Sequence, residues 1–154
     1  GGRSMNTITF DRNKVGPWVC ARAGGVFAPQ ISTCIGLERD GELVAGVLYE
    51  GFNGNSIRMH VASDGSREWL TRPFLAVCFD YPFRQLKVNK VLGLVDSMNE
   101  NALAFDKALG FKTECENEGA GKTGSLVILS MSRTDCRWLK LGERYGFQRE
   151  QIAA

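Results

Sequence analysis

Apolar and polar positions alternate along residues 56–62, where apolar side chains fall on one face and His60 falls on the other. A period of two is typical of a strand in a half-buried sheet. Two further apolar segments precede this one, and each boundary carries a turn sequence, Asp40-Gly41 or Asn53-Gly54. Turns of this kind join antiparallel neighbours. The pattern therefore predicts an antiparallel meander of three strands: residues 33–39, 43–49 and 56–62.

In the next part of the chain, apolar positions recur about every 3.6 residues instead of every two. Its large apolar side chains have the i, i+3, i+4, i+7 spacing of a buried helical stripe. They are Phe74, Val77, Cys78 and Tyr81. Pro73 is tolerated best in a first turn, so we expect the helix to begin near residue 71 or 72. Pro82 disfavours helical backbone in the residue before it, so we expect the helix to end at Tyr81.

A second helix is predicted between an apolar run and a Gly-Phe pair. The run, residues 90–95, predicts a strand, and residues 99–109 then place their apolar side chains on one helical face. Asn99 is suited to cap the exposed N–H groups of the first turn. Gly110 stands where a helix needs a residue with positive φ just after its last turn. Both ends of this helix are therefore marked by the sequence.

Shorter elements complete the expected order. Further strands are predicted at residues 8–10, 112–116 and 126–131, and short helices at 17–22 and 134–145, the last of which places Trp138 on the body of the domain. The strand–helix–strand–helix centre requires parallel pairing, because a helix separates its consecutive strands. The order β-β-β-α-β-α-β-β describes an α+β domain with a mixed α/β sheet.

Composition narrows the classes of protein to which the chain can belong. The first four residues precede Met5 and resemble a cloning remnant, which leaves residues 5–154 as one expected domain. A net charge of +2 is too small to argue for nucleic acid or an anionic membrane as a partner. Since no apolar run has the length of a membrane span and no signal peptide follows Met5, we expect a cytoplasmic protein.

The cysteines do not predict a metal site. All five are scattered, none forms a C-x-x-C pair, and the chain has a single histidine. We therefore expect no bound metal and reduced thiols in the core or on the surface.

The segment from Gly119 to Thr123 looks at first like a phosphate-binding loop. That motif requires another glycine where Glu116 stands, and a helix after the loop, whereas a strand-like run follows here. The segment is better interpreted as a hairpin loop with Lys122 at its tip.

A strand, an Asn that opens a helix, and the pair Gly110-Phe111 that closes it together resemble the coenzyme-A-binding half of the GNAT-family N-acetyltransferases. The resemblance covers about residues 56–132. It implies the GNAT acyl-CoA N-acyltransferase fold and acetyl-CoA as the co-substrate. It also implies that Asn99, Ala102 and Phe105 of the helix contact the cofactor beneath its pantetheine arm.

The resemblance further implies where the two ends of the cofactor bind. The backbone of Val61 and Ala62 would meet the thioester oxygen at a splayed end of the predicted strand. The pyrophosphate would lie before the first helix, but the two glycines of the family signature are missing there. The chain offers other residues for this role, namely Arg67, Trp69, Leu70, Thr71 and Arg72. An equally open alternative is a solvated loop in which Trp69 serves as a packing anchor.

His60 is the candidate general base. An alkylammonium group has a pKa of about 10.4, so an attacking amine must lose a proton, and a histidine titrates in a suitable range. The alternative is a histidine that only fills the polar side of a half-covered sheet. Asp106 stands where many family members have a Tyr that protonates the coenzyme A thiolate. A carboxylate is a poor donor unless burial raises its pKa, so we expect Asp106 to face solvent and water or Tyr81 to supply the proton.

These observations together predict an N-acetyltransferase that acts on a primary amine of a protein or small molecule. Direct attack in a ternary complex is expected, because no Cys stands beside the expected donor site. A non-catalytic acyl-CoA-binding module on the same scaffold remains an alternative, as does an interaction module that uses the sheet edge or the Trp138 tail. Residues 69–72, 81–83 and 136–139 resemble a subgroup common in phage and prophage genomes. A homodimer is compatible with the prediction, because dimers are frequent in such folds.

Overall fold

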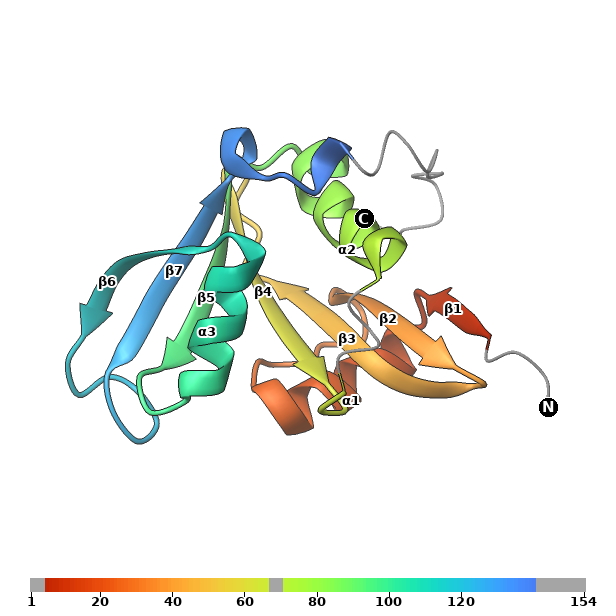
Figure 1. Cartoon of the computed structure of the whole chain (residues 1–154), viewed down its shortest axis with the longest axis horizontal. Coiled ribbons are helices and arrows are strands. Elements are labelled where there is room, and N and C mark those ends of the chain that lie inside the picture. The colour runs from red at the N-terminus through yellow and green to blue at the C-terminus, as the bar shows by residue number, and fades with distance from the viewer. Residues whose placement is uncertain (1–4, 67–70, 141–154) are drawn as a thin grey trace.

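The computed structural model describes residues 5–66 and 71–140, in which seven strands form one mixed sheet with the order β1-β2-β3-β4-β5-β7-β6 (Figure 1). The strands are β1 (Asn6–Thr9), β2 (Thr33–Arg39), β3 (Glu42–Glu50), β4 (Ser56–Ser63), β5 (Lys90–Asp96), β6 (Lys112–Asn117) and β7 (Leu126–Ser132). The helices are α1 (Arg12–Ala23), α2 (Arg72–Asp80) and α3 (Glu100–Leu109), together with a π-helical turn (Tyr81–Gln85) and a 3-10 turn (Arg133–Asp135). Among these helices, none is both long and apolar enough to cross a membrane.

The predicted meander is confirmed. Strands β2, β3 and β4 pair in antiparallel fashion, with Val47 opposite Val61 and Leu48 opposite His60. Asp40 and Gly41 both have positive φ angles, as the tight turn between β2 and β3 requires. The parallel pairing expected at the centre is confirmed between β4 and β5, and the predicted α+β class with it.

The two central strands separate soon after they meet. Residues 56–58 of β4 pair with residues 90–92 of β5, and beyond them the two strands diverge into a V (Figure 1). The other edge of β5 pairs with β7, which in turn pairs with β6, both in antiparallel fashion. The carboxyl ends of β4 and β5 therefore border a gap in the sheet.

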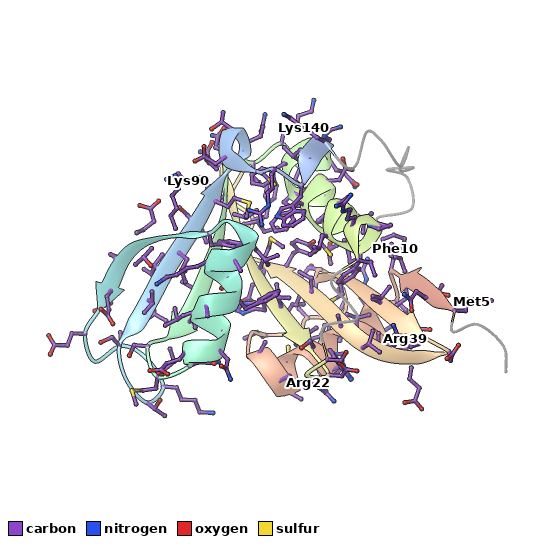
Figure 2. All side chains as sticks on the ribbon, in the orientation of Figure 1. Met5, Phe10, Arg22, Arg39, Lys90 and Lys140 are labelled. Carbon is purple, nitrogen blue, oxygen red and sulfur yellow. The ribbon has the colours of Figure 1, made fainter. Side chains whose placement is uncertain are left out.

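Helices cover the two faces of the sheet unequally. Helix α1 packs on β2, β3 and β4 through Val15 and Val19, which are fully buried. This close approach depends on glycine: a Cβ at Gly36 would lie 2.7 Å from the side chain of Val15, and one at Gly46 would lie 2.8 Å from that of Val19. The main core lies on the opposite face, where side chains fill the space between the sheet and helices α2 and α3 (Figure 2).

The N-terminal elements differ in length from the prediction. The first strand is Asn6–Thr9 instead of residues 8–10, and α1 spans Arg12–Ala23 instead of residues 17–22. The helix begins earlier because the side chain of Asp11 accepts the N–H group of Asn13 at 3.1 Å and caps the first turn. Pro17, which was expected to open the helix, lies inside it.

Helix α2 ends at Asp80, one residue before the predicted end, but the prediction that Pro82 moves Tyr81 out of the helical region is wrong. Tyr81 keeps helical backbone angles, and the chain continues as a π-helical turn in which Leu86 donates its N–H to the carbonyl of Tyr81 at 3.0 Å. Pro82 has no N–H to donate to the carbonyl of Cys78 four residues earlier. The buried hydroxyl group of Tyr49 donates to that carbonyl instead, so the lost helical hydrogen bond is replaced from β3.

Helix α3 matches its prediction at both ends. The side chain of Asn99 accepts the N–H of Ala102 at 3.2 Å, and Gly110 has φ of 119°. After β7 the tail crosses the end of α3. There the indole N–H of Trp138 donates to the carbonyl of Leu109 at 2.9 Å. The predicted position of Trp138 on the body is thus confirmed, whereas residues 141–145 of the predicted tail helix lie outside the described residues.

Candidate active site

The gap between β4 and β5 opens into a cleft of about 1230 Å³. Its walls come from the end of α1, residues 59–63 of β4, the start of α2, residues 94–96 of β5, and one side of α3. The loop before β7 and the tail at Arg137 and Trp138 complete the border. Sites for drug-sized ligands usually hold about 300–1,000 Å³. The cleft is therefore large enough for an extended ligand.

Most of the described candidate residues meet at this cleft. Those that line it are His60, Val61, Ala62, Arg72, Asn99, Ala102 and Phe105. Thr71 does not line it, and instead caps α2 by accepting the N–H of Phe74 at 3.3 Å. The other three candidates, Arg67, Trp69 and Leu70, lie outside the described residues. Segments far apart in the sequence thus converge on one surface, as the strand order requires.

The divergence of β4 and β5 leaves backbone groups of β4 available to a ligand. Successive N–H groups of a strand point to opposite edges. Of the neighbours Val61 and Ala62, one therefore directs its N–H toward β3 and the other toward the gap. A carbonyl oxygen placed beside this edge would find a backbone donor without any side chain.

The start of α2 gives the cleft an electropositive corner. Partial positive charge gathers at the amino end of a helix, where N–H groups lack helical partners. Arg72 begins α2 and lines the cleft there, whereas Lys122 lines the cleft from the separate loop before β7. This corner can hold an anion by the same physics as a glycine-rich phosphate loop, although the glycine pair is absent.

Asp96 anchors the loop that carries Lys122. Its carboxylate accepts the N–H of Thr123 at 2.6 Å, that of Met98 at 2.9 Å and that of Gly124 at 3.2 Å. These bonds, the one from Thr123 first, lower the pKa of Asp96 to about 2. The prediction of a hairpin loop for this segment is confirmed, because the loop connects β6 to β7.

His60 forms a close pair with Glu50 of β3. Nε2 of His60 lies 2.6 Å from Oε1 of Glu50, and the two side chains are only 9% and 19% exposed. Oε2 of Glu50 accepts the N–H of Val26 at 3.1 Å, and Nε of Arg58 lies 3.5 Å from Oε1. Burial raises the pKa of Glu50, but the bonds from His60 and Val26 outweigh it and leave the pKa below its usual value. Glu50 is therefore a carboxylate at neutral pH and orients His60.

The sequence reasoning missed Glu50, although a signal for it was present. In the hairpin of β3 and β4, Glu50 pairs with Arg58, so it lies diagonally across from His60 on the same face of the sheet. Diagonal neighbours on a sheet lie within reach of long side chains. The strand predicted over residues 43–49 stopped one residue short of Glu50, so the prediction did not contain the pair.

The expectation that Asp106 faces solvent is wrong. Asp106 is half-buried and lines the cleft from α3. It lies over Gly93 of β5, where a Cβ would be 3.2 Å from Oδ2 of Asp106. Burial raises the pKa of Asp106 to about 7. The side chain is placed inward because α3 packs its carboxyl-bearing face on β5 at the position of a glycine.

One thiol also lies in the cleft wall. Cys20 of α1 lines the cleft, while Cys34, Cys78 and Cys136 are buried and Cys115 is exposed, all five as free thiols. Burial, and then the charge of Glu50, raise the pKa of Cys20 above its usual value. Since the thiolate is the nucleophile, Cys20 is poorly suited to covalent catalysis at neutral pH.

Comparison with known proteins identifies the fold to which this geometry belongs. No protein-family model matches the chain, and no curated protein sequence does. Solved structures do match. Spermidine N-acetyltransferase SpeG of Vibrio cholerae, solved as a point variant, aligns with a TM-score of 0.65 at 13% identity, over 87% of this chain and 96% of that one.

Two other solved structures share this architecture. The ribosomal-protein-S18-alanine N-acetyltransferase of Escherichia coli aligns with a TM-score of 0.62 at 18% identity, over 83% of this chain and 94% of that one. The N-acetyltransferase PseH of Campylobacter jejuni, in complex with acetyl coenzyme A, aligns with a TM-score of 0.53 at 14% identity, over 66% of this chain and 68% of that one. Identities this low establish a shared architecture only. The described part of this chain therefore has the fold of the GNAT N-acetyltransferases, as its sequence predicted.

Proposed function

We propose that this protein transfers the acetyl group of acetyl-CoA to a primary amine. The observation that carries the proposal is the gap between β4 and β5, which opens a large cleft beside the free edge of β4. His60, which pairs with Glu50, lines the same cleft. Solved structures of this fold include N-acetyltransferases, one of them in complex with acetyl coenzyme A.

The cofactor would extend along the cleft from a charged end to an apolar one. Its phosphates suit the start of α2, where Arg72 and the helix N–H groups provide positive potential. Its pantetheine arm would then pass between β4 and β5 beside Asn99 and Phe105 of α3. The thioester oxygen would reach the N–H group that Val61 or Ala62 directs into the gap. Such a donor stabilises the oxyanion that forms when an amine attacks.

His60 would act as the general base. A bound alkylammonium must lose a proton before its nitrogen can attack, and the ring of His60 lies on the wall of the cleft. Glu50 would fix the orientation of the ring and stabilise its positive charge after proton transfer. Cys20 is held as a thiol by its raised pKa, which favours direct attack in a ternary complex over an acetyl-enzyme.

The fold neighbours and the position of His60 on the cleft wall support an amine as the acceptor. The similar proteins named above act on spermidine and on an alanine of a ribosomal protein. A small-molecule amine and a protein amine are therefore both acceptors to test here. The cytoplasmic location, the homodimer and the resemblance to phage and prophage proteins stay predictions.

Calorimetric titration of the purified protein with acetyl-CoA, and separately with coenzyme A, tests the proposal first. Micromolar affinity is expected, followed by thiol release when spermidine or a peptide with a free N-terminal alanine is added. Arg72→Ala should weaken binding at least several-fold. Arg39→Ala removes the same charge on the β2–β3 hairpin, outside the cleft, and should leave binding unchanged (Figure 2). No binding at millimolar cofactor would refute the proposal, and binding without turnover on any amine would leave an acyl-CoA-binding module.

A further inference from the structure

Arg22, in the last turn of α1, places a positive charge on the wall of the cleft (Figure 2). Its guanidinium packs over the ring of Trp18, 3.9 Å from the ring centroid, and its Nη1 donates to the carbonyl of Trp18 at 3.1 Å. A guanidinium has five N–H donors, so most of them stay available to a ligand. Among the described residues no carboxylate pairs with Arg22, whereas Lys14 and Arg58 each have one. Arg22 is therefore held in place without being neutralised.

Arg22 borders the cleft from the same side as His60. The ring of His60 lies on the sheet face covered by α1, because a Cβ at Gly25, just after that helix, would be 2.9 Å from it. Cys20, two residues before Arg22, has a pKa that is raised by burial and then by the charge of Glu50, the partner of His60. The end of α1 therefore carries a cation beside the candidate base.

In the described part of the chain, this side of the cleft offers no carboxylate to a second positive charge of a ligand. Two acidic side chains line the cleft, and both lie elsewhere. Asp96 of β5 accepts three backbone N–H groups, and Asp106 lies on the sheet face covered by α3. Glu50 does not line the cleft and is already paired with His60. A polyamine would therefore bring its additional charges toward Arg22 without a compensating anion.

The acceptor must bind on the side of the cleft that holds both groups. An attacking nitrogen has to come within about 2.6–3.2 Å of its base, or within one water of it. An acceptor that meets His60 thus lies on the α1 side of the gap, next to Arg22. The start of α2, which suits the cofactor phosphates, belongs to the opposite face of the sheet. Arg22 is therefore left for a group of the acceptor.

We propose that the acceptor is an amine that also carries a carboxylate, and that Arg22 binds this carboxylate while His60 faces the amine. The inference rests on the function proposed above and narrows it from any primary amine to an amino carboxylate. Two parallel N–H groups of a guanidinium fit the two oxygens of a carboxylate, and Trp18 holds the guanidinium in place. A polyamine such as spermidine is a poorer acceptor, because like charges in the site repel it.

The test measures thiol release from saturating acetyl-CoA with matched pairs of amines. Each pair joins an ω-amino carboxylate, from glycine to ε-aminocaproate, with the alkylamine of the same chain length. We expect at least one amino carboxylate to have a KM about 10-fold or more below that of its alkylamine, the usual scale for a hydrogen bond between charged groups. Cadaverine, whose second group is a cation, should have the highest KM of all.

Substitution of Arg22 shows which side chain recognises the carboxylate. Arg22→Gln should raise the KM for the preferred amino carboxylate about 10-fold or more and leave that for its alkylamine unchanged. Arg22→Glu should reverse the preference in favour of cadaverine. Arg39→Gln removes a positive charge on the β2–β3 hairpin, outside the cleft, and should change neither KM. Calorimetry should give the same affinity for coenzyme A in all of these proteins.

The outcomes separate the acceptor class from the proposed function. If no amino carboxylate is preferred to its alkylamine, or if Arg22→Gln keeps the preference, the inference is overturned and the acetyltransferase function stays in place. Arg22→Gln could also unfold at the same denaturant concentration as the unchanged protein but bind coenzyme A several-fold more weakly. Arg22 would then belong to the cofactor site, and the inference would again be overturned. An unchanged protein that releases no thiol with any amine would refute the function itself.

Discussion

The hydroxyl group of Tyr49 donates a hydrogen bond to the backbone carbonyl of Cys78, the carbonyl to which Pro82 has no N–H to donate. Both side chains of the pair Tyr49 and Tyr81 are buried, and their rings contact edge to face with centroids 4.9 Å apart. The bond therefore ties β3 to the end of α2 and lets the helix continue past a proline. Burial also raises the pKa of Tyr49 well above its usual value, so the hydroxyl keeps the proton that it donates.

Tyr49→Phe should destabilise the protein by about 1–3 kcal/mol, because a buried carbonyl loses the donor that replaces its helical partner. Chemical denaturation measures the loss. In a Pro82→Ala background residue 82 regains an N–H group that can donate to the Cys78 carbonyl, so the same substitution should cost less there. Equal costs in both backgrounds would show that the hydroxyl does not compensate for the proline.

Glu50→Gln should lower kcat by about 10-fold or more at pH 7, because an amide stabilises a protonated His60 less than a carboxylate does. The KM for acetyl-CoA should stay near its starting value. Steady-state assays of thiol release measure both constants. Glu38→Gln removes a carboxylate that pairs with Lys14 at 2.9 Å outside the cleft, and should have no effect on kcat.

His60→Ala should lose most turnover at neutral pH and regain part of it at high pH, where free amine is abundant. A pH profile of kcat for the variant checks this. If the variant were fully active at neutral pH, His60 would be a structural residue and the Glu50 prediction would lose its basis.

Asp106→Asn should stabilise the fold at alkaline pH. The folded-state pKa of about 7 lies above the usual value of 3.8, so the folded protein binds more protons than the unfolded chain between these two values. Stability is therefore lost as pH rises through this window, and the loss is complete above it. At about 1.4 kcal/mol per pKa unit the upper limit is about 4 kcal/mol, and water at the cleft wall reduces it.

Denaturation of both proteins at pH 4 and pH 8 measures this effect. The gain from Asp106→Asn should be present at pH 8 and absent at pH 4. A gain of the same size at both values would mean that the substitution acts through packing and not through the charge. A variant that is more stable but less active would be the usual sign of a residue kept for function.

Two substitutions of Asn99 should distinguish its helix-capping role from a contact with the cofactor. Asn99→Ala removes the acceptor for the Ala102 N–H and should cost about 1 kcal/mol of stability. Asn99→Asp keeps the cap, so its stability should match that of the unchanged protein. The added negative charge in the cleft should nevertheless weaken coenzyme A binding, which calorimetry measures. Unchanged affinity in Asn99→Asp would place the cofactor away from the start of α3.

The structure confirmed those predictions that rest on residues within the predicted element itself. Asn99 and Gly110 mark the ends of α3 within the helix itself, so the sequence was sufficient there. Pro82 misled because its compensating donor comes from Tyr49, on a distant strand. Burial of Asp106 depends on Gly93, whose position under α3 only the packed fold reveals. Glu50 and His60 fall between these cases: the turn sequence predicted the hairpin that carries them, but the predicted strand ended at residue 49, and the register that brings them together is seen only in the fold.

The short ladder between β4 and β5 divides the domain into two units that are each continuous in sequence. Strands β1 to β4 with α1 and α2 come first, and β5 to β7 with α3 follow. The units also meet through side chains such as Phe79, which packs against Phe111 and Trp138. A chain opened near Lys87, between the units, should therefore yield two fragments that reassemble. Because the cleft draws its walls from both, a bound cofactor should tighten their association, so that ligand affinity can be read from fragment complementation.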